Sequence, residues 1–524
     1  MHMATSKVTY APGTRPATKK IMWIFAIGQM GWEIFAGIIG NWLVAYFQPT
    51  TRDGLPQFIQ QGTVWWVLTV IGVITAIGRI FDAVTDPLVA NWSDNSKNKR
   101  GRRIPFMFWA TFPLAIITVL IFAVHIPETV ANYQIWNAVL LAVLLLGFYF
   151  ALTCYCTPYN ALMAELSKTP EDRMYISTAI SLTFIVGNLF AFVPSAVVGG
   201  LKGVMSAATA YNVVFIVLAV IGVVCCLLPT LLIKEPEFVT PVAEEKKSNV
   251  FKSLGATFKN KEFIVFVISD ICYFIGLTMF QTGLQKYVVT LFGLSEGWTT
   301  YLLGIMTLLS VALYFFVTPL TKKFGKKKLL ITAFIWFAVV FLVAALGVSG
   351  TVTYYTAAND ASVATLASAG VLKMPGIVLG LFVAVFAAFP MAILGILPQS
   401  IVADIAAEDT IKTGEKREGM FYAARTFAFK MGQSVAMVLF STFAMIGAFE
   451  GYSRNVYTEA NGSETVEFIK GSVVDGNGYR IALIVAAAFV ILGAIVISFY
   501  NEKKVNETIA SATKLAERPA EEAK

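Results

Sequence analysis

The sequence predicts an all-α membrane protein with twelve transmembrane helices arranged as two six-helix bundles. Three observations lead to this fold class. The chain of 524 residues is 57% hydrophobic and only 14% charged, with a mean hydropathy of +0.70, whereas soluble domains carry about 25% charged residues. Twelve apolar runs are long enough to cross a bilayer. A polar stretch separates the first six runs from the last six.

The spans follow one another in order, and each can cross a hydrocarbon core of ~30 Å at 1.5 Å per residue. In the first half we expect helices at residues 21–47, 64–92, 104–124, 135–163, 174–198 and 211–233. In the second half we expect helices at residues 262–292, 299–320, 329–349, 375–403, 419–447 and 479–500. The predicted organisation is a leader (1–20), an N-terminal bundle (21–233), a central loop (234–261), a C-terminal bundle (262–500) and a tail (501–524).

Lysine and arginine are distributed unevenly between the segments that join the spans. If both termini lie inside, thirty of the 40 Lys and Arg residues fall in inside segments, seven outside and three within helices. Cytoplasmic loops of membrane proteins carry this excess of positive charge. We therefore predict cytoplasmic termini, with the first helix acting as an uncleaved targeting signal, and a location in the plasma membrane, specifically a bacterial inner membrane.

Cysteine and histidine are not placed for metal or disulfide chemistry. The five cysteines all lie in apolar segments, which argues against a disulfide framework or a zinc site. The only histidines are His2 and His125, too few for haem ligation or histidine-based metal catalysis. No nucleophile–base motif of an enzyme is present. The net charge is +8, but its basic residues follow the distribution expected of cytoplasmic loops in a membrane protein and do not indicate nucleic-acid binding. We expect no enzyme activity, no cofactor and no nucleic-acid partner.

The second span carries charged residues deep in the membrane, in the run Arg79-Ile-Phe-Asp82-Ala-Val-Thr-Asp86-Pro87. A charge near the bilayer centre costs about 2.5–3.5 kcal/mol, so such residues are usually functional. The spacing of Asp82 and Asp86 puts both carboxylates on one helix face, and Arg79 returns to that face. Carboxylate oxygens are hard ligands for small cations. The span predicts a site for Na⁺, Li⁺ or H⁺ at Asp82 and Asp86.

The two halves resemble each other weakly. The segment after the second span reads Ser93-Asp-Asn-Ser-Lys-Asn-Lys-Arg-Gly-Arg-Arg103, and the segment after the eighth reads Thr321-Lys-Lys-Phe-Gly-Lys-Lys-Lys328. A basic, glycine-containing turn at the same place in each half indicates the parallel repeat of a major facilitator fold, with the site between the halves near the midplane. Anchoring to anionic lipid is the alternative explanation of these turns.

Longer stretches carry a resemblance to a known family. Asp82-Ala-Val-Thr-Asp86-Pro87, Trp92-Ser-Asp-Asn and Arg100-Gly-Arg-Arg-Ile-Pro-Phe106 are similar to the glycoside–pentoside–hexuronide:cation symporters, the relatives of melibiose permease in the major facilitator superfamily. Two further stretches match, at residues 158–173 and 404–419. The resemblance implies cation-coupled transport of a sugar or glycoside.

The resemblance also implies roles for single residues. The residues of the family that bind the coupling cation are matched here by Asp82, Asp86 and Thr153. Lys430 matches a lysine that lies close to these residues, and Arg79 matches an arginine of the second span. Glu33 stands at a sugar-binding position, but the pocket departs from that of the galactoside transporter at Cys156, Asn160 and Ser177. By position alone, Trp32, Tyr159 and Gln281 are further candidates. Our expected substrate-binding residues are Trp32, Glu33, Cys156, Tyr159, Asn160, Gln281 and Lys430.

Five of these residues give a charge balance that favours a cation. At 1.5 Å per residue, Glu33, Asp82, Asp86 and Lys430 lie ~10–18 Å from the inner ends of their helices, so they could converge near the midplane. Three carboxylates against Arg79 and Lys430 leave one negative charge, which a bound cation would neutralise. Other roles remain open: an Arg79–Asp82 structural pair, a snorkelling Lys430, or a Thr153 bonded within its own helix.

The basic loops on the inner side are candidates for a gate. We expect Arg102 and Arg103 to brace the inward-closed state through charge pairs with inner-side acids. The expected gate residues are Arg102, Arg103, Glu165, Asp172 and Asp404.

The predicted function is cation-coupled symport of a sugar or glycoside by alternating access between two rocking bundles. We expect the protein to act as a monomer whose partners are a small-molecule substrate, a monovalent cation and the lipid bilayer. One alternative is a Na⁺-coupled lysophospholipid transporter, because Cys156 and Ser177 make the pocket less polar. A non-transporting membrane sensor is the second alternative. The sequence leaves the cation and the sugar open.

Overall fold

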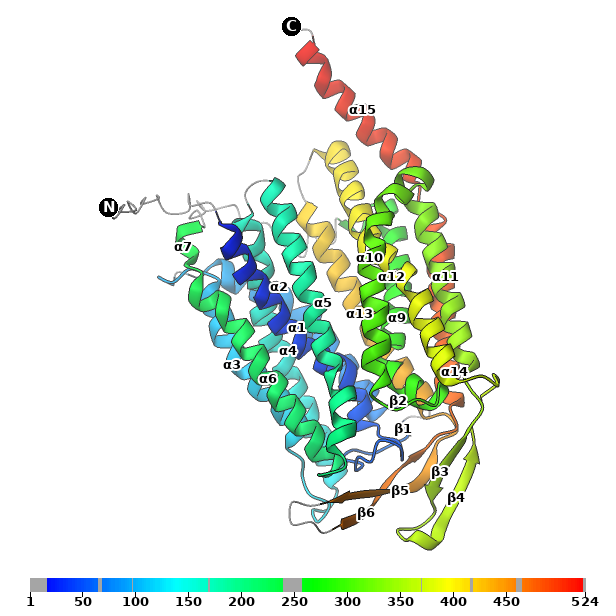
Figure 1. The fold of residues 1–524 in the computed structure, drawn as a ribbon. Coiled ribbons are helices and arrows are strands. Elements are labelled where there is room, and N and C mark those ends of the chain that lie inside the picture. Colours follow the sequence, from blue (N-terminus) through cyan, green and yellow to red (C-terminus); the bar gives the residue numbers. More distant parts are fainter. Residues whose placement is uncertain are drawn as a thin grey trace, which may run out of the picture.

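The computed structural model describes residues 17–521, apart from residues 65–67, 97, 168–169, 239–256, 369, 415–417 and 459–463. Parts of the predicted leader (1–16), central loop (239–256) and tail (522–524) therefore lie outside the described residues. Two bundles of long helices stand side by side, with a small β-sheet at one end (Figure 1). We call this end the sheet face. The opposite end, where the first long helix begins and the last bundle helix ends, is the terminal face.

The helices form two sets of six. The first half comprises α1 (Lys19–Phe47), α2 (Val70–Asp94), α3 (Ile104–Ala123), α4 (Tyr133–Leu166), α5 (Pro170–Leu201) and α6 (Ala207–Leu232). The second comprises α9 (Lys261–Lys286) with the π-helical turn η1 (Tyr287–Leu291), α10 (Trp298–Phe324), α11 (Lys326–Leu346), α12 (Gly376–Thr413), α13 (Glu418–Ala444) and α14 (Asn477–Ile497). Within the halves, α1 packs against α5 and α6, and α9 packs against α13 and α14. Between the halves, α2 packs against α13, and α5 against α10.

These are the twelve predicted helices, and two boundaries differ clearly. α2 begins at Val70 rather than residue 64, because the strands β1 (Thr63–Val64) and β2 (Leu68–Thr69) precede it. The Thr69 hydroxyl then caps the helix by accepting a hydrogen bond from the Gly72 amide at 3.1 Å. α12 continues to Thr413, beyond the predicted end at residue 403.

The helices have the composition of membrane spans. Among the described residues, eleven helices are long and apolar enough to cross a membrane. α2 is not one of them, because Arg79, Asp82 and Asp86 interrupt its apolar sequence. It nevertheless lies inside the bundle, packed against α4 and α13. The helix with the most charged residues in its interior is thus enclosed by helices of both halves.

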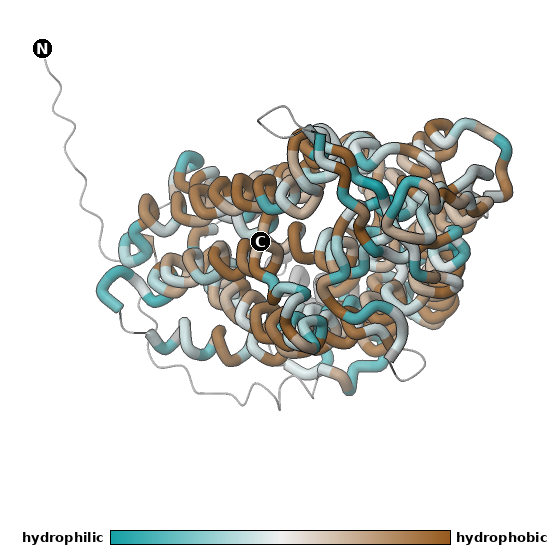
Figure 2. The backbone as a smooth tube through the Cα atoms, turned by 90° about the horizontal axis from the view of Figure 1, so that it is seen from below, coloured by the Kyte–Doolittle hydropathy of each residue, from teal (hydrophilic) through white to brown (hydrophobic). Residues whose placement is uncertain are grey.

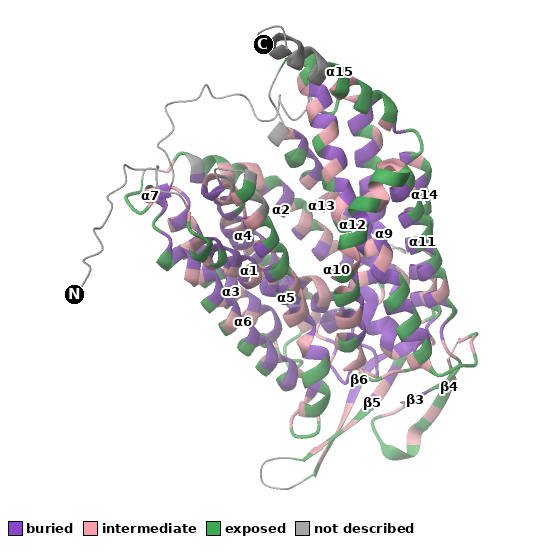
Figure 3. Ribbon diagram, turned by 45° about the horizontal axis from the view of Figure 1, so that its top comes forward, coloured by how far each residue is buried: buried purple, intermediate pink, exposed green. Residues whose placement is uncertain are grey.

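Large apolar side chains cover the outward sides of the helices. Trp109 of α3 is 69% exposed and Phe315 of α10 80%. Hydrophobic residues run along most of the helical segments (Figure 2), and buried residues concentrate between the helices while exposed ones face outward (Figure 3). A soluble protein rarely exposes so much apolar surface, so these outward sides are the lipid-facing surface.

Two glutamates reveal the internal repeat more clearly than the loop sequences do. Glu235, in the short helix α7 (Glu235–Phe238) after α6, accepts hydrogen bonds from the backbone amides of Arg102, Arg103 and Ile104 at the start of α3. In the second half, Glu502, which opens α15 (Glu502–Glu521) after α14, does the same for Lys326 and Lys327 at the start of α11. A carboxylate at a helix N-terminus satisfies free amides and complements the helix dipole.

A glycine makes room for each of these caps. Gly101 has φ +115°, and a Cβ atom there would lie 2.2 Å from Glu235 Oε2. Gly325 has φ +82°, and its Cβ would lie 3.1 Å from Glu502 Oε2. Only glycine adopts such backbone angles at low cost. The basic, glycine-containing turns noted in the sequence are thus the two halves of one structural repeat.

At the sheet face, two long loops of the second half form a four-stranded antiparallel sheet. Its strands are β3 (Thr351–Tyr355), β4 (Val363–Ala367), β5 (Phe449–Thr458) and β6 (Glu464–Val473), in the order β4-β3-β5-β6. The short 3₁₀ turn η2 (Asp360–Ser362) joins β3 and β4. Tyr355 pairs with Tyr452, so the loop after α11 and the loop after α13 become one layer.

This sheet is attached to the first half. The Thr51 amide donates to the Ser472 carbonyl at 2.9 Å, and the Asn455 side-chain amide donates to the Gly54 carbonyl at 3.1 Å. Farther along the sheet, the Thr458 amide donates to the Gly203 carbonyl at 3.0 Å. The segment between α1 and α2 is therefore held against a layer made entirely by the second half.

Ion pairs also join the halves at the sheet face. Lys286 of α9 pairs with Asp53 of the first half, both nearly fully buried, and Lys202 pairs with Glu296 at 2.7 Å. Burial alone would raise the pKa of Asp53, but the Lys286 ammonium and the hydrogen bonds from Thr50 hold this pKa below its ordinary value. The Asp53 carboxylate therefore remains charged, and the sheet face is closed.

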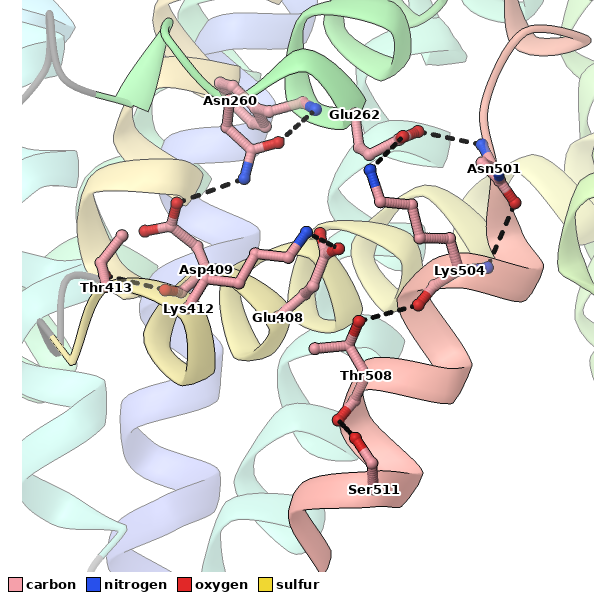
Figure 4. Close-up of polar contacts among 11 residues, drawn as sticks. Asn260, Glu262, Glu408, Asp409, Lys412, Thr413, Asn501, Lys504, Thr508 and Ser511 are labelled. Atoms are coloured by element: carbon pink, nitrogen blue, oxygen red, sulfur yellow. Dashed lines mark hydrogen bonds and ion pairs between the residues drawn. The ribbon is translucent and has the colours of Figure 1, made fainter.

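At the terminal face, polar contacts join helices of the same half. Glu262 at the start of α9 accepts from the Asn501 amide at 2.9 Å, and the Asn260 side-chain amide donates to Asp409 of α12 at 3.2 Å (Figure 4). Glu408 is buried and pairs with Lys412 one turn along α12. These contacts tie the second half together at the terminal face, while the contacts described above close the sheet face.

Candidate functional site

A cavity of about 470 Å³ lies between the two halves, with walls from α1, α2, α4 and α5 on one side and α9 and α13 on the other. It contains every charged residue of the predicted balance: Glu33, Arg79, Asp82, Asp86 and Lys430. These residues come from three helices that are far apart in the sequence, and the fold brings them together.

Lys430 bridges the two carboxylates of α2. Its Nζ atom lies 2.9 Å from Asp82 Oδ2 and 2.6 Å from Asp86 Oδ2. Asp82 is 3% exposed. Because α13 belongs to the other half, this contact crosses the interface between the bundles, and Lys430 does not snorkel to a membrane surface. Two carboxylates one helical turn apart repel each other, and here a tethered ammonium screens that repulsion.

Hydroxyl groups of α4 complete the carboxylate pair. Thr153 Oγ1 donates to Asp82 Oδ1 at 2.8 Å, and Thr157 Oγ1 donates to Asp86 Oδ1 at 3.3 Å. Thr85 Oγ1 lies 3.4 Å from Thr153 Oγ1. Thr153 therefore faces the acids rather than bonding only within its own helix.

Sequence reasoning missed Thr157 and Thr85. The available signal was spacing: Thr157 follows Thr153 by one helical turn, and Thr85 follows Asp82 at i+3, so both hydroxyls share a face with residues already singled out. Four carboxylate and three hydroxyl oxygens now converge at one place. Within the described residues, no group of three His, Cys, Asp or Glu side chains could hold a metal ion. This donor set suits a small monovalent cation or a proton rather than a tightly held divalent metal.

Arg79 does not form the alternative structural pair with Asp82. Its guanidinium lies over the Tyr149 ring, 5.1 Å from the centroid, and in the described part of the chain its Nε atom has no hydrogen-bond partner. An arginine over an aromatic face is stabilised by cation–π attraction. The guanidinium is thus held at the cavity wall, and it makes no ion pair with a carboxylate of the described residues.

Glu33 lines the same cavity from α1. Gly187 of α5 makes room for it, since a Cβ atom there would lie 2.9 Å from Glu33 Cβ. No hydrogen bond or ion pair of Glu33 occurs among the described residues. Its carboxyl group is available to a molecule in the cavity.

Most of the other expected substrate residues also line the cavity. They are Trp32, Cys156, Asn160 and Gln281. The Trp32 indole nitrogen is buried without a hydrogen-bond partner among the described residues. Tyr159 is a correction: it is fully buried, its hydroxyl donates to the Phe25 carbonyl at 2.9 Å, and its ring stacks on Phe25 with centroids 4.1 Å apart. It packs α4 against α1 and does not line the cavity.

Several polar lining residues were not anticipated: Asn41, Asn188, Thr426 and Gln433. Gln433 could have been found, because it follows Lys430 at i+3 on the same face of α13. A second chamber of about 360 Å³ adjoins the cavity and shares Phe184, Asn188, Leu277 and Gln281 with it. The site therefore extends beyond the charged centre into a chamber lined by uncharged residues.

A second buried ion pair lies beside the cavity, in the second half. Arg425 Nε lies 2.7 Å from Asp270 Oδ2, and both side chains are buried. The Phe266 and Phe274 rings flank the guanidinium at 5.9 Å. Arg425 is thus neutralised by its own partner. Sequence reasoning left Arg425 out of the charge balance but missed Asp270.

Four of the five expected gate residues form ion pairs within their own halves here. Arg102 and Arg103 both pair with Glu165 at the end of α4, the latter at 2.6 Å. Asp404 pairs with Lys326, and Asp172 lies in the first turn of α5. These ion pairs join helices of the same half and not the two halves. The expected role of these residues, bracing the inward-closed state, therefore remains a prediction.

Comparison with known proteins assigns the fold and the family. A family model described as "MFS/sugar transport protein" matches residues 24–504. The chain belongs to this family. This confirms the predicted membership of the sugar–cation symporters of the major facilitator superfamily. The chain is an integral membrane secondary transporter.

Individual relatives differ in what their names say they carry. The isoprimeverose transporter of Lactiplantibacillus pentosus is 24% identical over 268 residues, covering 49% of this chain and 52% of that protein. The sodium-dependent lysophosphatidylcholine symporter 1 of Xenopus tropicalis is 22% identical over 464 residues, covering 82% and 79%. The crystal structure of a D-xylose–proton symporter matches with a TM-score of 0.59 at 14% identity, covering 92% of this chain and 97% of that one. This structural likeness confirms the major facilitator fold.

Proposed function

We propose that this protein imports a sugar or glycoside together with a monovalent cation, by alternating access across a bacterial inner membrane. The observation that carries the proposal is the position of Lys430, whose ammonium lies between Asp82 and Asp86 at 2.9 and 2.6 Å. A positive charge at this place is required while no cation is bound. The carboxylates and the three neighbouring threonine hydroxyls offer the same place to Na⁺, Li⁺ or H⁺.

The proposed coupling is an exchange of positive charges. A cation that binds at Asp82, Asp86 and Thr153 takes over the screening of the acids and releases Lys430. Lys430 belongs to the second half and the acids to the first, so this exchange changes the attraction between the halves. The freed ammonium, with Glu33 and Arg79, then faces the substrate. Each ligand thereby raises the affinity for the other, as linkage requires.

The positive-charge distribution supports cytoplasmic termini, which places the sheet face outside. The Asp53–Lys286 and Lys202–Glu296 pairs close that side, and we infer from this orientation an inward-facing state. Rocking the halves breaks these pairs and brings the terminal face together. In that outward-facing state Arg102, Arg103, Asp172 and Asp404 are proposed to brace the inner gate.

A sugar fits the lining of the cavity better than a lipid does. Hydroxyl groups can bond to Glu33, Asn41, Asn160, Asn188 and Gln281, and Trp32 offers a ring face. These carboxamide and carboxylate groups make no hydrogen bond to other described residues, so they can donate to or accept from the hydroxyl groups of a sugar. The relative named as an isoprimeverose transporter supports the same substrate class.

The second candidate is Na⁺-coupled transport of a lysophospholipid. The relative named as a lysophosphatidylcholine symporter matches over most of both chains, and the cavity has apolar patches at Phe184, Phe274, Leu277 and Phe429. These apolar residues belong to α5, α9 and α13. A lipid would place its chain there.

Uptake into proteoliposomes tests the proposal. Labelled neutral glycosides, pentosides and hexuronides, with one lysophosphatidylcholine, are supplied under an imposed Na⁺ or H⁺ gradient. Accumulation of a sugar above its equilibrium level under one gradient supports the proposal and identifies the ion. Accumulation of the lysolipid alone supports the second candidate, and sugar equilibration without concentration under both gradients overturns cation coupling.

A further inference from the structure

The sheet face contains a chamber larger than the central cavity. Its volume is about 840 Å³, and its walls are the segments at residues 56–61 and 125–134 of the first half and strands β5 and β6 of the second. We call it the sheet-face chamber. Among the described residues, none lines both this chamber and the central cavity, so the two are separate spaces.

The chamber is lined by polar groups that lack partners in the protein. Gln57 is 8% exposed, and its side-chain amide makes no hydrogen bond within the described part of the chain. Gln61 Oε1, His125 Nε2 and Glu467 Oε2 are likewise buried without a partner there. Such groups cost free energy unless a ligand or water satisfies them. Their convergence on one chamber, from three different segments, indicates a site for a ligand with several hydrogen-bonding groups.

The same walls carry aromatic rings. Phe58 stacks on His125 with centroids 3.7 Å apart, and Tyr133, Tyr452 and Phe468 also line the chamber. Ring faces provide apolar contact, while carboxylate and amide oxygens accept hydrogen bonds from hydroxyl groups. This combination suits a saccharide, which has apolar C–H faces and a rim of hydroxyls.

The charges in the chamber argue against an anionic ligand. Among the described lining residues, the glutamates Glu128, Glu450 and Glu467 stand against one cation, Lys470, which already pairs with Glu450 at 2.8 Å. Burial lowers the pKa of His125 to about 4, so its imidazole is neutral at physiological pH. A uronate, a sulfonate or a phosphate would meet a net negative wall.

We propose that the sheet-face chamber is a second binding site, for an uncharged saccharide, distinct from the central cavity. This goes beyond the proposed function and does not depend on it, because the chamber could bind a saccharide whatever the central cavity transports. Its walls come from both halves, so a bound saccharide holds them together. Occupation of the chamber therefore favours the state in which the sheet face is closed.

Equilibrium dialysis of the purified full chain with labelled cellobiose, maltose and xylobiose tests the site, with glucuronate as the anionic control. Hydrogen exchange with and without each sugar locates the binding. We expect saturable binding of at least one neutral sugar, with slowed exchange at residues 56–61 and 464–473. In the Glu467→Gln and Gln57→Leu variants this binding should weaken at least about tenfold, a loss of ~1.4 kcal/mol, and glucuronate should not protect these segments.

The matched control is Glu33→Gln, which alters the central cavity only. It should leave the protection at residues 56–61 and 464–473 unchanged, even if transport is lost. The proposal is overturned if no neutral sugar of the panel protects the two segments, or if protection survives both chamber substitutions. Since the readout is local exchange rather than uptake, failure of the proposed transport function would leave this result interpretable. Glu467→Gln preserves side-chain size, so loss of folding would be seen directly as fast exchange throughout the chain.

Discussion

The ammonium of Lys430 in α13 lies 2.6 Å from the carboxylate of Asp86 in α2, and these two helices belong to opposite halves of the transporter. The contact lies in the cavity between the halves, with Asp82 on the other side of the same ammonium. One side chain therefore balances the charge of the proposed cation site and links the two bundles.

Replacing Lys430 by Gln should make the protein depend on an added cation. Without the ammonium, the Asp82 and Asp86 carboxylates repel each other, and a bound Na⁺ or Li⁺ is then needed to screen this repulsion. A ligand that binds only the folded state raises stability as its concentration exceeds its Kd. We expect NaCl or LiCl, against choline chloride, to raise the Tm of Lys430→Gln more than that of the wild type. Lys430→Arg, which retains the charge, should resemble the wild type. An equal response in all three proteins would contradict the exchange of charges.

Replacing Asp53 by Asn should open the sheet face. Removing one partner of a buried ion pair costs about 3–5 kcal/mol, because the other charge remains buried, so the closed state loses most of its advantage. The distance between spin labels at Val130→Cys and Val363→Cys, one on each half, in a background without the native cysteines, reports this change. The control is Arg454→Gln, which breaks the partly exposed pair with Asp360, worth about 0–1 kcal/mol. Unchanged distances in Asp53→Asn would show that the pair does not hold the gate.

Replacing Asp270 by Asn should destabilise the second half. Arg425 would remain buried between Phe266 and Phe274 without its partner, at a cost of about 3–5 kcal/mol. The double change Asp270→Leu with Arg425→Met removes both charges and should recover most of this loss. Reversible unfolding in detergent measures both variants. If the double variant is less stable than the single one, the pair has a role other than charge compensation.

Acid should weaken the sheet face through His125. The folded-state pKa is lowered to about 4 by burial, while an unfolded histidine titrates near 6.5. The unfolded chain therefore binds more protons between these values, so stability is complete above about pH 6.5 and falls as pH decreases toward 4. Thermal unfolding from pH 7.5 to 4 should show this loss, and His125→Phe should flatten that part of the profile. A wild-type profile identical to that of His125→Phe would disprove the assignment.

The twelve helices and the charged centre could be predicted because their signals are local. Apolar runs of about 20 residues identify spans whatever they pack against, and an i, i+4 pair of acids in a span is visible without a partner. Thr153 and Lys430 were added by resemblance, and the structure places them within hydrogen-bonding distance of those acids. The region around Asp82 was thus readable from sequence because its chemistry is unusual for a membrane.

The features that were missed depend on contacts between distant segments. Tyr355 pairs with Tyr452, and no local sequence pattern predicts that the loops after α11 and α13 form one sheet. Glu235, which caps α3, lies more than 130 residues along the chain from the amides that donate hydrogen bonds to it. Tyr159 follows Cys156 by one turn, yet it packs on Phe25, because the rotation of α4 about its axis is set by its neighbours. The Arg79 guanidinium likewise lies over the Tyr149 ring and does not pair with Asp82.

The most direct test of the central claim compares two modes of transport in Asp82→Asn and Asp86→Asn, using the sugar identified by the uptake panel. Gradient-driven accumulation requires cation coupling, whereas exchange of internal for external sugar requires only the substrate pocket and alternating access. We predict that both variants lose accumulation and retain measurable exchange, with Thr111→Ser, away from the cavity, as a wild-type-like control. Accumulation at the wild-type level in both variants would contradict the claim that this carboxylate pair binds the coupling cation.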